Sequence, residues 1–586
     1  MSAISDAFAK APPQKPGVQK TPELARILAL PRRKLDLDAG TIDGQKILDL
    51  NSLYLTNAGK CEKWPKCPVC ASGSAGLWPT QSAALIEAER AWGLFGAMGV
   101  GSGKSLVSLL LTDVFDAKKS VLLVPSSLKN QLKTRDFFDY GRHFRLPLNR
   151  ITVVSYDELS IATGAFVLDR VEPDLIIADE VHNLARIASA RTKRFIRYMQ
   201  SHPSTRFCGM SGTVTRRSLR DYSHLCEIAL RGNSPLPYRW GDLQEWADAL
   251  DPIRDPIPIG ALRVFIDPQD PRLKMSADEQ RQAAREGFRR RLVETPGVVA
   301  TSESWEGASL VVTALRPQVP KSVEQAIDRL FKTWEVGGEE IEDKVRLVEI
   351  ARQLAVGFYY KWLWPNDIPD REWLDARAAW HKAVRLILQR SRAGLDSPLL
   401  VTRAVMNGTI DDQWVVQAWE AWKLVKDRPV PPVEPVWIDD FAIQAALAWA
   451  KASPEPAIIW YSHNAVGDAL SDGGYRVYGS GEDAGEADPT DQKIIVCSIR
   501  AQGTGKNLQR YARALVVEPP PSGATTEQLL GRLHRPGQLA DEVNFEYFMH
   551  TPELEEAPLR AVADALYVQQ TQGQRQKLLV ARRVNW

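Results

Sequence analysis

The segment Met98-Gly99-Val100-Gly101-Ser102-Gly103-Lys104-Ser105 decides how this chain is interpreted. It follows the apolar run 92–95 and precedes the apolar run 106–111, which predicts a strand, a glycine-rich loop and then a helix. Glycines let successive backbone N–H groups turn toward a phosphate, and the start of the helix adds its positive dipole end. We therefore expect a phosphate-binding loop, the alternative being an ordinary glycine-rich surface loop.

Two residues of this loop would carry the chemistry. A lysine at the start of the helix reaches the β- and γ-phosphates of a nucleotide, and the hydroxyl after it ligates Mg²⁺. The strict pattern G-x-x-x-x-G-K-[ST] has a glycine where this chain has Met98, so the match is to G-x-G-K-S in its strand–loop–helix context. The expected ligand is a nucleoside triphosphate with Mg²⁺, held by Gly101, Ser102, Gly103, Lys104 and Ser105.

The size and composition are those of a large soluble protein. At 586 residues the chain has room for roughly four domains of average size, or for fewer large ones. The 74 basic and 72 acidic residues nearly cancel, so any basic surface for nucleic acid must be local. No apolar run approaches membrane-spanning length, and the polar N-terminus does not resemble a signal peptide. Since the six cysteines do not form a disulfide framework, we expect a cytoplasmic protein with no membrane partner.

A cysteine-rich segment lies at residues 61–76. Cys67-x-x-Cys70 has the spacing of a zinc knuckle, and Cys61 could supply a third thiolate. A structural zinc site normally has four ligands, and the next histidine along the chain is His143. Two interpretations stay open: a turn held by Zn²⁺ with a distant or solvent fourth ligand, or a cluster of unligated thiols on a loop.

Two regions of the chain, 77–235 and 441–586, alternate apolar runs with helical patterns. This alternation predicts an α/β fold with parallel sheets, in which ligand chemistry gathers at the carboxyl ends of the strands. The expected strands lie at 120–125, 151–156, 174–182, 205–213, 456–462, 494–498 and 514–518.

The remaining parts of the chain have other residue patterns. Residues 1–60 are weakly patterned and predict an N-terminal extension. Residues 236–440 have long helical patterns and predict a mostly helical insertion, with a Pro-rich, linker-like stretch at 429–436. Thirteen of the 18 tryptophans lie between Trp240 and Trp449, which favours aromatic packing in a helical region over platforms for stacking bases.

An acidic pair, Asp179-Glu180, follows the apolar run 175–178. In a nucleotide-hydrolysing site one carboxylate ligates Mg²⁺ and another serves as base for the attacking water. We assign these roles to Asp179 and Glu180 in that order, the alternative being an acidic pair that opens a helix. Charge developing on the γ-phosphate also needs a cation, and Arg532 and Arg535 share one helix face from which a second domain would deliver it.

Taken together, these motifs resemble those of superfamily 2 DExH-box helicases and translocases, and within them the Snf2-like branch. The resemblance covers roughly residues 77–217 and 455–550. The chain departs from the family pattern at Met98, Ser105 and Lys506, where alanine, threonine and a small apolar residue are usual. The matching segments are Leu77-x-Pro79-x-Gln81, Gly101-x-Gly103-Lys104-Ser105, Val124-Pro125-Ser126-Ser127, Asp179-Glu180-Val181-His182, Ser211-Gly212-Thr213, Gly503-Thr504-Gly505-Lys506-Asn507-Leu508-Gln509 and Gln528-x-x-Gly531-Arg532-x-x-Arg535-x-Gly537-Gln538.

The resemblance implies two RecA-like parallel-sheet domains, 77–235 and 441–586, with the helical insertion between them. It implies ATP hydrolysis with Mg²⁺ at the cleft between these domains, with Gln81 on the adenine and Gly505 beside the nucleotide. It also implies nucleic-acid contacts across both domains, made by hydroxyls, amides and helix N-termini as well as by basic side chains. The residues expected to make or couple these contacts are Ser126, Ser127, Ser211, Thr213, Arg216, Ser462, Asn507 and Gln528.

The expected partner is DNA, either duplex or branched, with RNA as an alternative, and the expected state is a monomer of bacterial or phage origin. Snf2-like proteins typically track one strand of an intact duplex, which favours translocation over strand separation. No Asn-Gly or Asp-Gly hairpin flanked by alternating apolar residues, which could serve as a wedge, lies between the motifs. Two other functions stay open: a non-hydrolysing nucleic-acid-binding scaffold of the same fold, and a helicase that separates the strands of branched DNA or RNA.

Overall fold

The computed structural model describes residues 16–33, 42–56, 60–63, 67, 70, 76–99, 101–212, 214, 217–300, 308–341, 343–389, 395–535 and 537–586. This part of the chain is an α/β structure with one six-stranded and one seven-stranded sheet, each parallel throughout. The α/β class and the parallel sheets expected from the sequence are therefore confirmed. Within the same residues, no helix is both long and apolar enough to cross a membrane.

The first sheet has the strand order β3-β2-β4-β5-β1-β6. Its central strands are buried along their whole length because helices cover both faces, which explains their continuous apolar runs. Alternate residues of β1 serve the two faces: Phe95 and Ala97 join one core, and Leu94 joins the other. The strands are β1 (Leu94–Ala97), β2 (Ser120–Val124), β3 (Ile151–Ser155), β4 (Leu175–Asp179), β5 (Arg206–Ser211) and β6 (Val298–Ala300).

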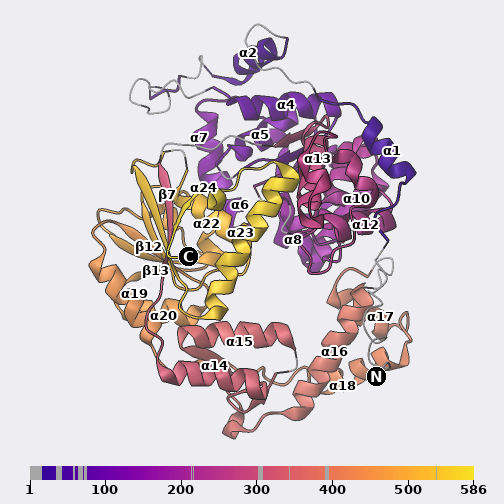
Figure 1. Ribbon diagram of the computed structural model, residues 1–586. Helices are drawn as coiled ribbons and strands as arrows, with labels where there is room; N and C mark the ends of the chain where they lie inside the picture. The colour runs from indigo at the N-terminus through magenta and orange to yellow at the C-terminus, as the bar shows by residue number, and fades with distance from the viewer. Residues whose placement is uncertain are drawn as a thin grey trace, which may run out of the picture.

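Helices lie on both faces of this sheet, and together they form lobe 1, residues 77–300 (Figure 1). Leu85 and Leu109 bring α4 and α5 into the core on one face. Phe195, Trp246 and Phe288 bring α10, α12 and α13 into the core on the other face. The helices of lobe 1 are α4 (Pro79–Ala91), α5 (Lys104–Val114), α6 (Ser126–Gln131), α7 (Phe137–Gly141), α8 (Tyr156–Ser160), α9 (Val167–Val171), α10 (Ala190–Ser201), α11 (Ser223–Leu230), α12 (Trp240–Leu250) and α13 (Ala277–Val293).

The second sheet has the order β13-β14-β12-β15-β16-β7-β17 and is the centre of lobe 2, residues 308–356 and 441–586. Its strands are β7 (Ser309–Leu315), β12 (Ala457–Tyr461), β13 (Arg476–Tyr478), β14 (Ile494–Ser498), β15 (Arg513–Val516), β16 (Glu542–Phe548) and β17 (Arg582–Val584). Its helices are α14 (Lys321–Thr333), α15 (Lys344–Val356), α19 (Phe441–Ala452), α20 (Asn464–Asp472), α21 (Ile499–Gln502), α22 (Gly523–Leu533), α23 (Pro552–Gln572) and α24 (Lys577–Val580).

The structure divides the expected helical insertion, 236–440, among three units. The strand β6 and the helices α12 and α13 pack in lobe 1, whereas β7, α14 and α15 pack in lobe 2. The expected assignment of residues 236–440 to one helical insertion is therefore wrong for these elements. A short strand such as β6 carries no local signal of its partner, and the partner of β7, the strand β16, comes more than 200 residues later.

The middle of that segment, residues 358–437, forms a separate insertion module. Its ends pair as an antiparallel ribbon. Two of its three helices pack through Trp380 and Trp419, whose ring centroids lie 5.0 Å apart, and the third helix joins the same apolar cluster. Trp373, which contacts Trp422, is likewise buried, so the tryptophans serve packing here. The elements are β10 (Phe358–Trp362), α16 (Arg371–Gln389), α17 (Pro398–Met406), α18 (Gln413–Val425) and β11 (Val433–Trp437), preceded in lobe 2 by the small ribbon β8 (Glu335–Val336) and β9 (Glu339–Glu340).

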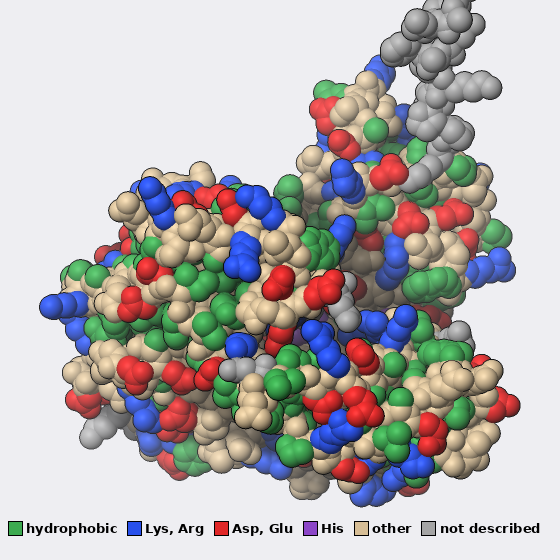
Figure 2. All heavy atoms as spheres, turned by 90° about the horizontal axis from the view of Figure 1, so that it is seen from below, with side chains coloured by type: hydrophobic (Ala, Val, Ile, Leu, Met, Phe, Trp, Pro, Cys, Tyr) green, Lys and Arg blue, Asp and Glu red, His purple; other side chains and the backbone are tan. Residues whose placement is uncertain are grey.

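The long helix α23 connects the two lobes, since it packs on α22 of lobe 2 and on α13 of lobe 1 (Figure 1). Asp564 of this helix pairs with Arg217 of lobe 1 at 2.7 Å, and the Tyr567 hydroxyl donates to Asp251 at 2.6 Å. In Figure 2, basic and acidic side chains are interspersed on the face shown, in keeping with the net charge of +2. Near the N-terminus, α1 (Pro22–Ala29) packs on lobe 1, and α2 (Ile42–Tyr54) lies against α4.

Candidate functional site

The glycine-rich loop lies between β1 and α5, at the carboxyl end of the first sheet. Gly101 and Gly103 have φ angles of 89° and 74°, in the left-handed region that glycine enters without steric cost. A Cβ atom on Gly103 would lie 2.0 Å from Nε2 of Gln81, so no larger residue fits there without a shift. The backbone of the loop therefore requires these glycines.

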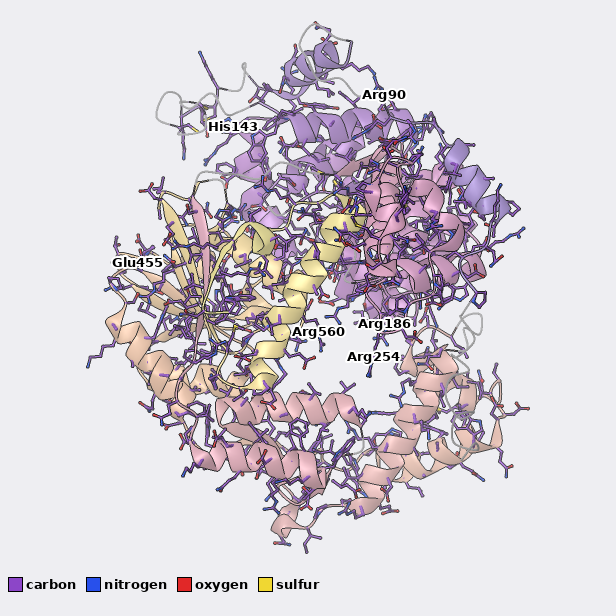
Figure 3. All side chains as sticks on the ribbon, in the orientation of Figure 1. Arg90, His143, Arg186, Arg254, Glu455 and Arg560 are labelled. Carbon is purple, nitrogen blue, oxygen red and sulfur yellow. The ribbon has the colours of Figure 1, made fainter. Side chains whose placement is uncertain are left out.

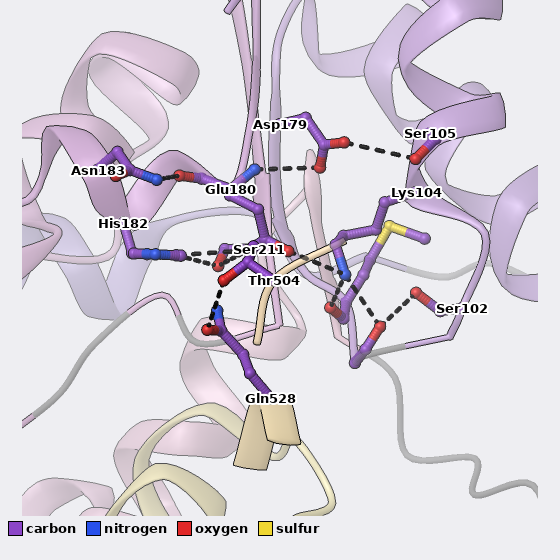
Figure 4. A network of polar contacts seen from close by, with 12 residues as sticks. Ser102, Lys104, Ser105, Asp179, Glu180, His182, Asn183, Ser211, Thr504 and Gln528 are labelled. Atoms are coloured by element: carbon purple, nitrogen blue, oxygen red, sulfur yellow. Dashed lines mark hydrogen bonds and ion pairs between the residues drawn. The ribbon is translucent and has the colours of Figure 1, made fainter. Parts of the chain in front are cut away.

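Lys104 begins α5 and turns back into the loop (Figure 4). Its Nζ donates to the carbonyl oxygens of Met98 at 3.3 Å and Gly99 at 3.1 Å, and lies 4.0 Å from Oε1 of Glu180. The Ser102 hydroxyl donates to the same Gly99 carbonyl at 2.8 Å. Because Lys104 is only 8% exposed, its ammonium charge interacts with anions through a medium of low dielectric constant. A buried cation at a helix N-terminus suits a phosphate group.

The hydroxyl of Ser105, on α5, lies close to the carboxylate of Asp179, at the end of β4. The Ser105 hydroxyl donates to Oδ2 of Asp179 at 3.5 Å, and the Tyr156 hydroxyl fixes the end of β4 by donating to the Asp179 carbonyl at 2.8 Å. Burial, and then the charge of Glu180, raise the pKa of Asp179 to about 6. Hydroxyl and carboxylate oxygens are the ligands that Mg²⁺ uses beside a triphosphate, and a cation here would stabilise the ionised carboxylate.

Glu180 is held by several groups of lobe 1 (Figure 4). Its backbone is left-handed, with φ of 57°, and the Asn183 amide donates to its carbonyl at 2.9 Å. Its Oε2 accepts from Ser211 at 2.9 Å and lies 3.3 Å from Nδ1 of His182, which contacts the Ser211 hydroxyl at 2.9 Å. Burial opposes ionisation, but Lys104 and His182 outweigh it and hold the pKa of Glu180 well below its usual range. The carboxylate therefore stays charged. We assigned no role to His182 from sequence, although it lies two positions after Glu180.

Arg532 lies in the last turn of α22 in lobe 2, whereas Arg535 follows the helix, which ends at Leu533. The expectation that both arginines share one helix face is therefore wrong. Arg532 donates to the carbonyl of Gln528 at 3.0 Å and to that of Lys506 at 3.2 Å. Burial, and then the charge of Arg535, lower the pKa of Arg532 to about 9, whereas Glu180 of lobe 1 acts in the opposite direction. Among the described residues neither arginine pairs with a carboxylate, and Nε of Arg535 is buried without a hydrogen-bond partner. Two cations in this position favour an anion between the lobes.

The expected motif at 503–509 lies where the lobes meet. Gly505 has φ of 76°, and a Cβ atom on it would lie 1.7 Å from Cδ2 of Leu128 on α6 of lobe 1. Thr504 donates to Oε1 of Gln528 at 3.4 Å within lobe 2. Lys506, where the family pattern has a small apolar residue, is buried and pairs with Asp483 at 3.0 Å. The glycine at 505 thus permits a close approach of the two lobes.

Both the oxygen and the nitrogen of the Gln81 side-chain amide form hydrogen bonds within the chain. Its Oε1 accepts from the backbone N–H of Trp78 at 2.8 Å, and its Nε2 donates to the Gly103 carbonyl at 3.3 Å. These bonds tie the start of α4 to the glycine-rich loop. The expected contact of Gln81 with adenine stays a prediction.

The residues expected to contact nucleic acid are spread over both lobes. Ser126 and Ser127 begin α6 and are exposed, and Asn507 is exposed on lobe 2. Ser462 donates its backbone N–H to Glu518 at 2.7 Å. Thr213 and Arg216 lie outside the described residues.

A histidine of lobe 1 lies beside the three cysteines of the cysteine-rich segment and is a fourth candidate metal ligand. Cys61, Cys67 and Cys70 are buried together, and His143, which follows α7, completes a group whose ligand atoms all lie within 4.8 Å of one another. Figure 3 marks the position of His143. This group could bind a metal ion such as zinc. His143 is 73 residues from Cys70 along the chain, and no local pattern could have paired the two.

Comparison with known proteins does not identify a relative of known function. No protein-family model matches the chain, and no curated protein is significantly similar to it.

Proposed function

We propose that this protein is an ATP-dependent nucleic-acid motor, which hydrolyses ATP between two RecA-like lobes and moves along DNA. The observation that carries the proposal is the meeting of two half-sites. Lobe 1 contributes Lys104, Ser105, Asp179 and Glu180. From lobe 2, Arg532 lies within electrostatic reach of Glu180, and Arg535 lies within electrostatic reach of Tyr140 in lobe 1. Among the described residues neither arginine has a carboxylate partner. A triphosphate with its metal ion would supply the missing anion.

In this proposal, lobe 1 binds the triphosphate. Lys104 contacts the β- and γ-phosphates, and the backbone N–H groups of the glycine-rich loop donate to their oxygens. Ser105 and Asp179 would hold Mg²⁺, which, when bound, neutralises charge on the β- and γ-phosphates. Gln81 keeps the loop in place through its bond to Gly103.

Glu180 then orients the water that attacks the γ-phosphorus. The water oxygen bonds to phosphorus, the bond from phosphorus to the β–γ bridging oxygen breaks, and the products are ADP and inorganic phosphate. Because the pKa of Glu180 lies below its usual range, its carboxylate accepts a hydrogen bond from the attacking water, and the proton that the water loses ends on an oxygen of the inorganic phosphate. Ser211 and His182 hold that carboxylate in one orientation.

Lobe 2 completes the site when the lobes close. Arg532 already interacts electrostatically with Glu180, so closure would bring its guanidinium or that of Arg535 to the γ-phosphate. Ser211 ends β5, the strand between β4 and β1, and therefore lies between the acidic pair and the glycine-rich loop. Hydrolysis of the γ-phosphate would thus alter the surroundings of Ser211, which contacts Glu180. The family resemblance assigns Ser211 and the residues after it to coupling with nucleic acid.

The test is the rate of ATP hydrolysis with single-stranded DNA, duplex DNA, branched DNA and RNA as separate additions. We expect hydrolysis to be stimulated by DNA. Lys104→Ala should lose both ATP affinity and turnover, because the charge on the phosphates is gone. Glu180→Gln should keep ATP binding and lose turnover by roughly 10²–10⁴, the range typical of a side chain that accepts a proton or a hydrogen bond from the attacking water.

The control for these variants is Glu340→Gln, which changes an exposed carboxylate of the small ribbon β8–β9 in the same way. It should hydrolyse ATP at the wild-type rate. Full activity in Lys104→Ala or Glu180→Gln would remove the motor assignment. ATP binding without hydrolysis in the wild-type protein, on every nucleic acid, would favour the scaffold instead.

A further inference from the structure

We propose that Cys61, Cys67, Cys70 and His143 together bind one Zn²⁺ ion, and that this ion fastens the segment before α4 to the end of α7 in lobe 1. The proposal adds a structural metal site with a ligand from a distant part of the chain. It does not depend on the motor function.

The distances fit a tetrahedral site. The Sγ atoms of Cys61 and Cys70 lie 3.6 Å apart, Sγ of Cys67 lies 3.8 Å from Nε2 of His143, and Sγ of Cys70 lies 3.6 Å from Nδ1 of the same ring. With zinc–sulfur bonds of about 2.3 Å, ligand atoms at the corners of a tetrahedron lie about 3.8 Å apart. One nitrogen of His143 and the three Sγ atoms lie within 4.8 Å of one another, so a small closing of the group would let zinc reach all four.

The kind of ligands selects the ion. Three thiolates and one imidazole form one of the usual ligand sets of structural zinc, whereas Mg²⁺ and Ca²⁺ prefer oxygen. Binding displaces a proton from each of the three thiols, so the site with Zn²⁺ carries a net charge of −1. None of the three cysteines forms a disulfide in this structure, and the 3.6 Å between the Sγ atoms of Cys61 and Cys70 is far longer than a disulfide bond of about 2.0 Å.

The described residues of this segment provide almost no apolar core, which makes a metal link useful here. Among the described residues, the buried cluster here consists of Cys61, Cys67 and Cys70 alone. Small units without enough apolar side chains are commonly stabilised by a metal ion or by disulfides. Zinc would replace the missing core with four bonds.

The position of His143 shows which part of lobe 1 the ion would connect to the cysteine-rich segment. The backbone on both sides of it is already paired with the end of α2: Thr56 N–H donates to the His143 carbonyl at 2.9 Å, and Arg145 N–H donates to the Tyr54 carbonyl at 2.7 Å. Directly before His143, α7 carries Tyr140, which interacts electrostatically with Arg535 of lobe 2. The metal would therefore fasten the N-terminal segment beside the meeting point of the lobes.

The first measurement is the metal content of untagged full-length protein purified without chelator. We expect about one zinc per chain, and X-ray absorption at the zinc edge should fit three sulfur ligands and one nitrogen. Replacing zinc by Co²⁺ should give the thiolate-to-cobalt charge-transfer band and the intense visible bands of a tetrahedral site. Cys67→Ala and His143→Ala should lose most of the metal, and Cys226→Ala, which removes a buried thiol in another core, should keep it.

Thiol labelling gives a second readout that needs no variant. In the wild-type protein, Cys61, Cys67 and Cys70 should resist alkylation until a strong chelator removes the zinc, as peptide mapping by mass spectrometry would detect. Absence of zinc in the wild-type protein, a disulfide among these cysteines, or an all-sulfur site with full zinc in His143→Ala would overturn the proposal. One zinc per chain without any ATP hydrolysis would keep this proposal and reject the proposed function.

Discussion

Arg194 of α10 and Asp396 of the insertion module form a buried, bidentate ion pair. Nη2 and Nε of Arg194 donate to the two carboxylate oxygens at 3.0 and 3.1 Å, and the residues are 202 positions apart in the chain. Arg194 also donates to the carbonyls of Leu159 and Ile161, at 2.9 and 2.5 Å. Next to it, Lys193 donates to the carbonyl of Leu388 at the end of α16. This pair fastens the insertion module to lobe 1.

Removing one partner of this pair should be costly. Asp396→Ala leaves the Arg194 charge buried without its carboxylate, and we expect a loss of about 3–5 kcal/mol in the free energy of unfolding of the unit that contains it. Urea unfolding followed by fluorescence, which the tryptophans of the insertion module make sensitive, would measure it. Asp411→Ala, at an exposed position of the same module, should change stability by less than about 0.5 kcal/mol. Equal midpoints for the two variants would show that the pair does not fasten the module.

The arginines of lobe 2 should act on turnover rather than on binding. Because an arginine finger stabilises charge that develops only in the transition state, Arg535→Ala should leave ATP affinity nearly unchanged and lower kcat by roughly 10³. Arg532→Ala is the second variant, since Arg532 interacts with Glu180. Arg510→Ala, an exposed arginine of the same lobe, should have wild-type kinetics. Wild-type kcat in both Arg532→Ala and Arg535→Ala would place the catalytic cation elsewhere.

Ser211 should influence the pH dependence of hydrolysis. Its hydroxyl donates to Glu180 and helps to lower the pKa of that carboxyl, so Ser211→Ala should raise this pKa. Since the charged carboxylate orients the water, kcat falls as pH decreases through this pKa, and the fall should begin at higher pH in the variant. The loss of one charge-assisted hydrogen bond corresponds to a shift of about one to two pH units.

The measurement is kcat against pH for the wild-type protein and for Ser211→Ala, with Ser201→Ala as the matched control at the end of α10. The Ser201 hydroxyl bonds only locally, to carbonyls of α10 and to the neighbouring histidine. Because the pKa of Glu180 lies well below its usual range, the profiles should differ only at acidic pH, and the measurement extends to the lowest pH at which the protein stays folded. Coincidence of the Ser211→Ala and wild-type profiles down to that pH would contradict the prediction.

The choice between translocation and strand separation can be measured directly. We expect the protein to move along duplex DNA, so it should displace a triplex-forming strand in an ATP-dependent reaction. Separating base pairs would need a wedge that unstacks bases at a cost of a few kcal/mol per step. The buried Trp373, Trp380 and Trp419 of the insertion module are engaged in packing, which leaves them unsuited to that role. Efficient unwinding of a forked duplex without triplex displacement would reverse this assignment.

The local elements of the candidate site could be predicted because their signals are contiguous. The glycines and Lys104 stand together at a strand–helix junction, and the acidic pair follows an apolar run of four buried residues, 175–178, in β4. In both cases the pattern of a few neighbouring residues determines the backbone, and the parallel sheet then brings the strand ends to one edge.

The division of the chain into lobes could not be predicted in the same way. Strands β6 and β7 lie in a segment whose pattern is mainly helical, and each belongs to a different sheet. A strand acquires its place by pairing with neighbours that come from anywhere in the chain, and side-chain periodicity says only that it is extended.

By itself, the sequence determined the α/β class, the glycine-rich loop and the acidic pair, because backbone geometry and burial patterns act over a few neighbouring residues. Only the tertiary structure decided that His143 joins the three cysteines, that Arg194 meets Asp396 and that Arg532 comes within electrostatic reach of Glu180. The physical reason is the same in each case. These contacts join residues that are far apart in the chain, and their partners are chosen by how the helices and sheets pack, which no local run of residues encodes.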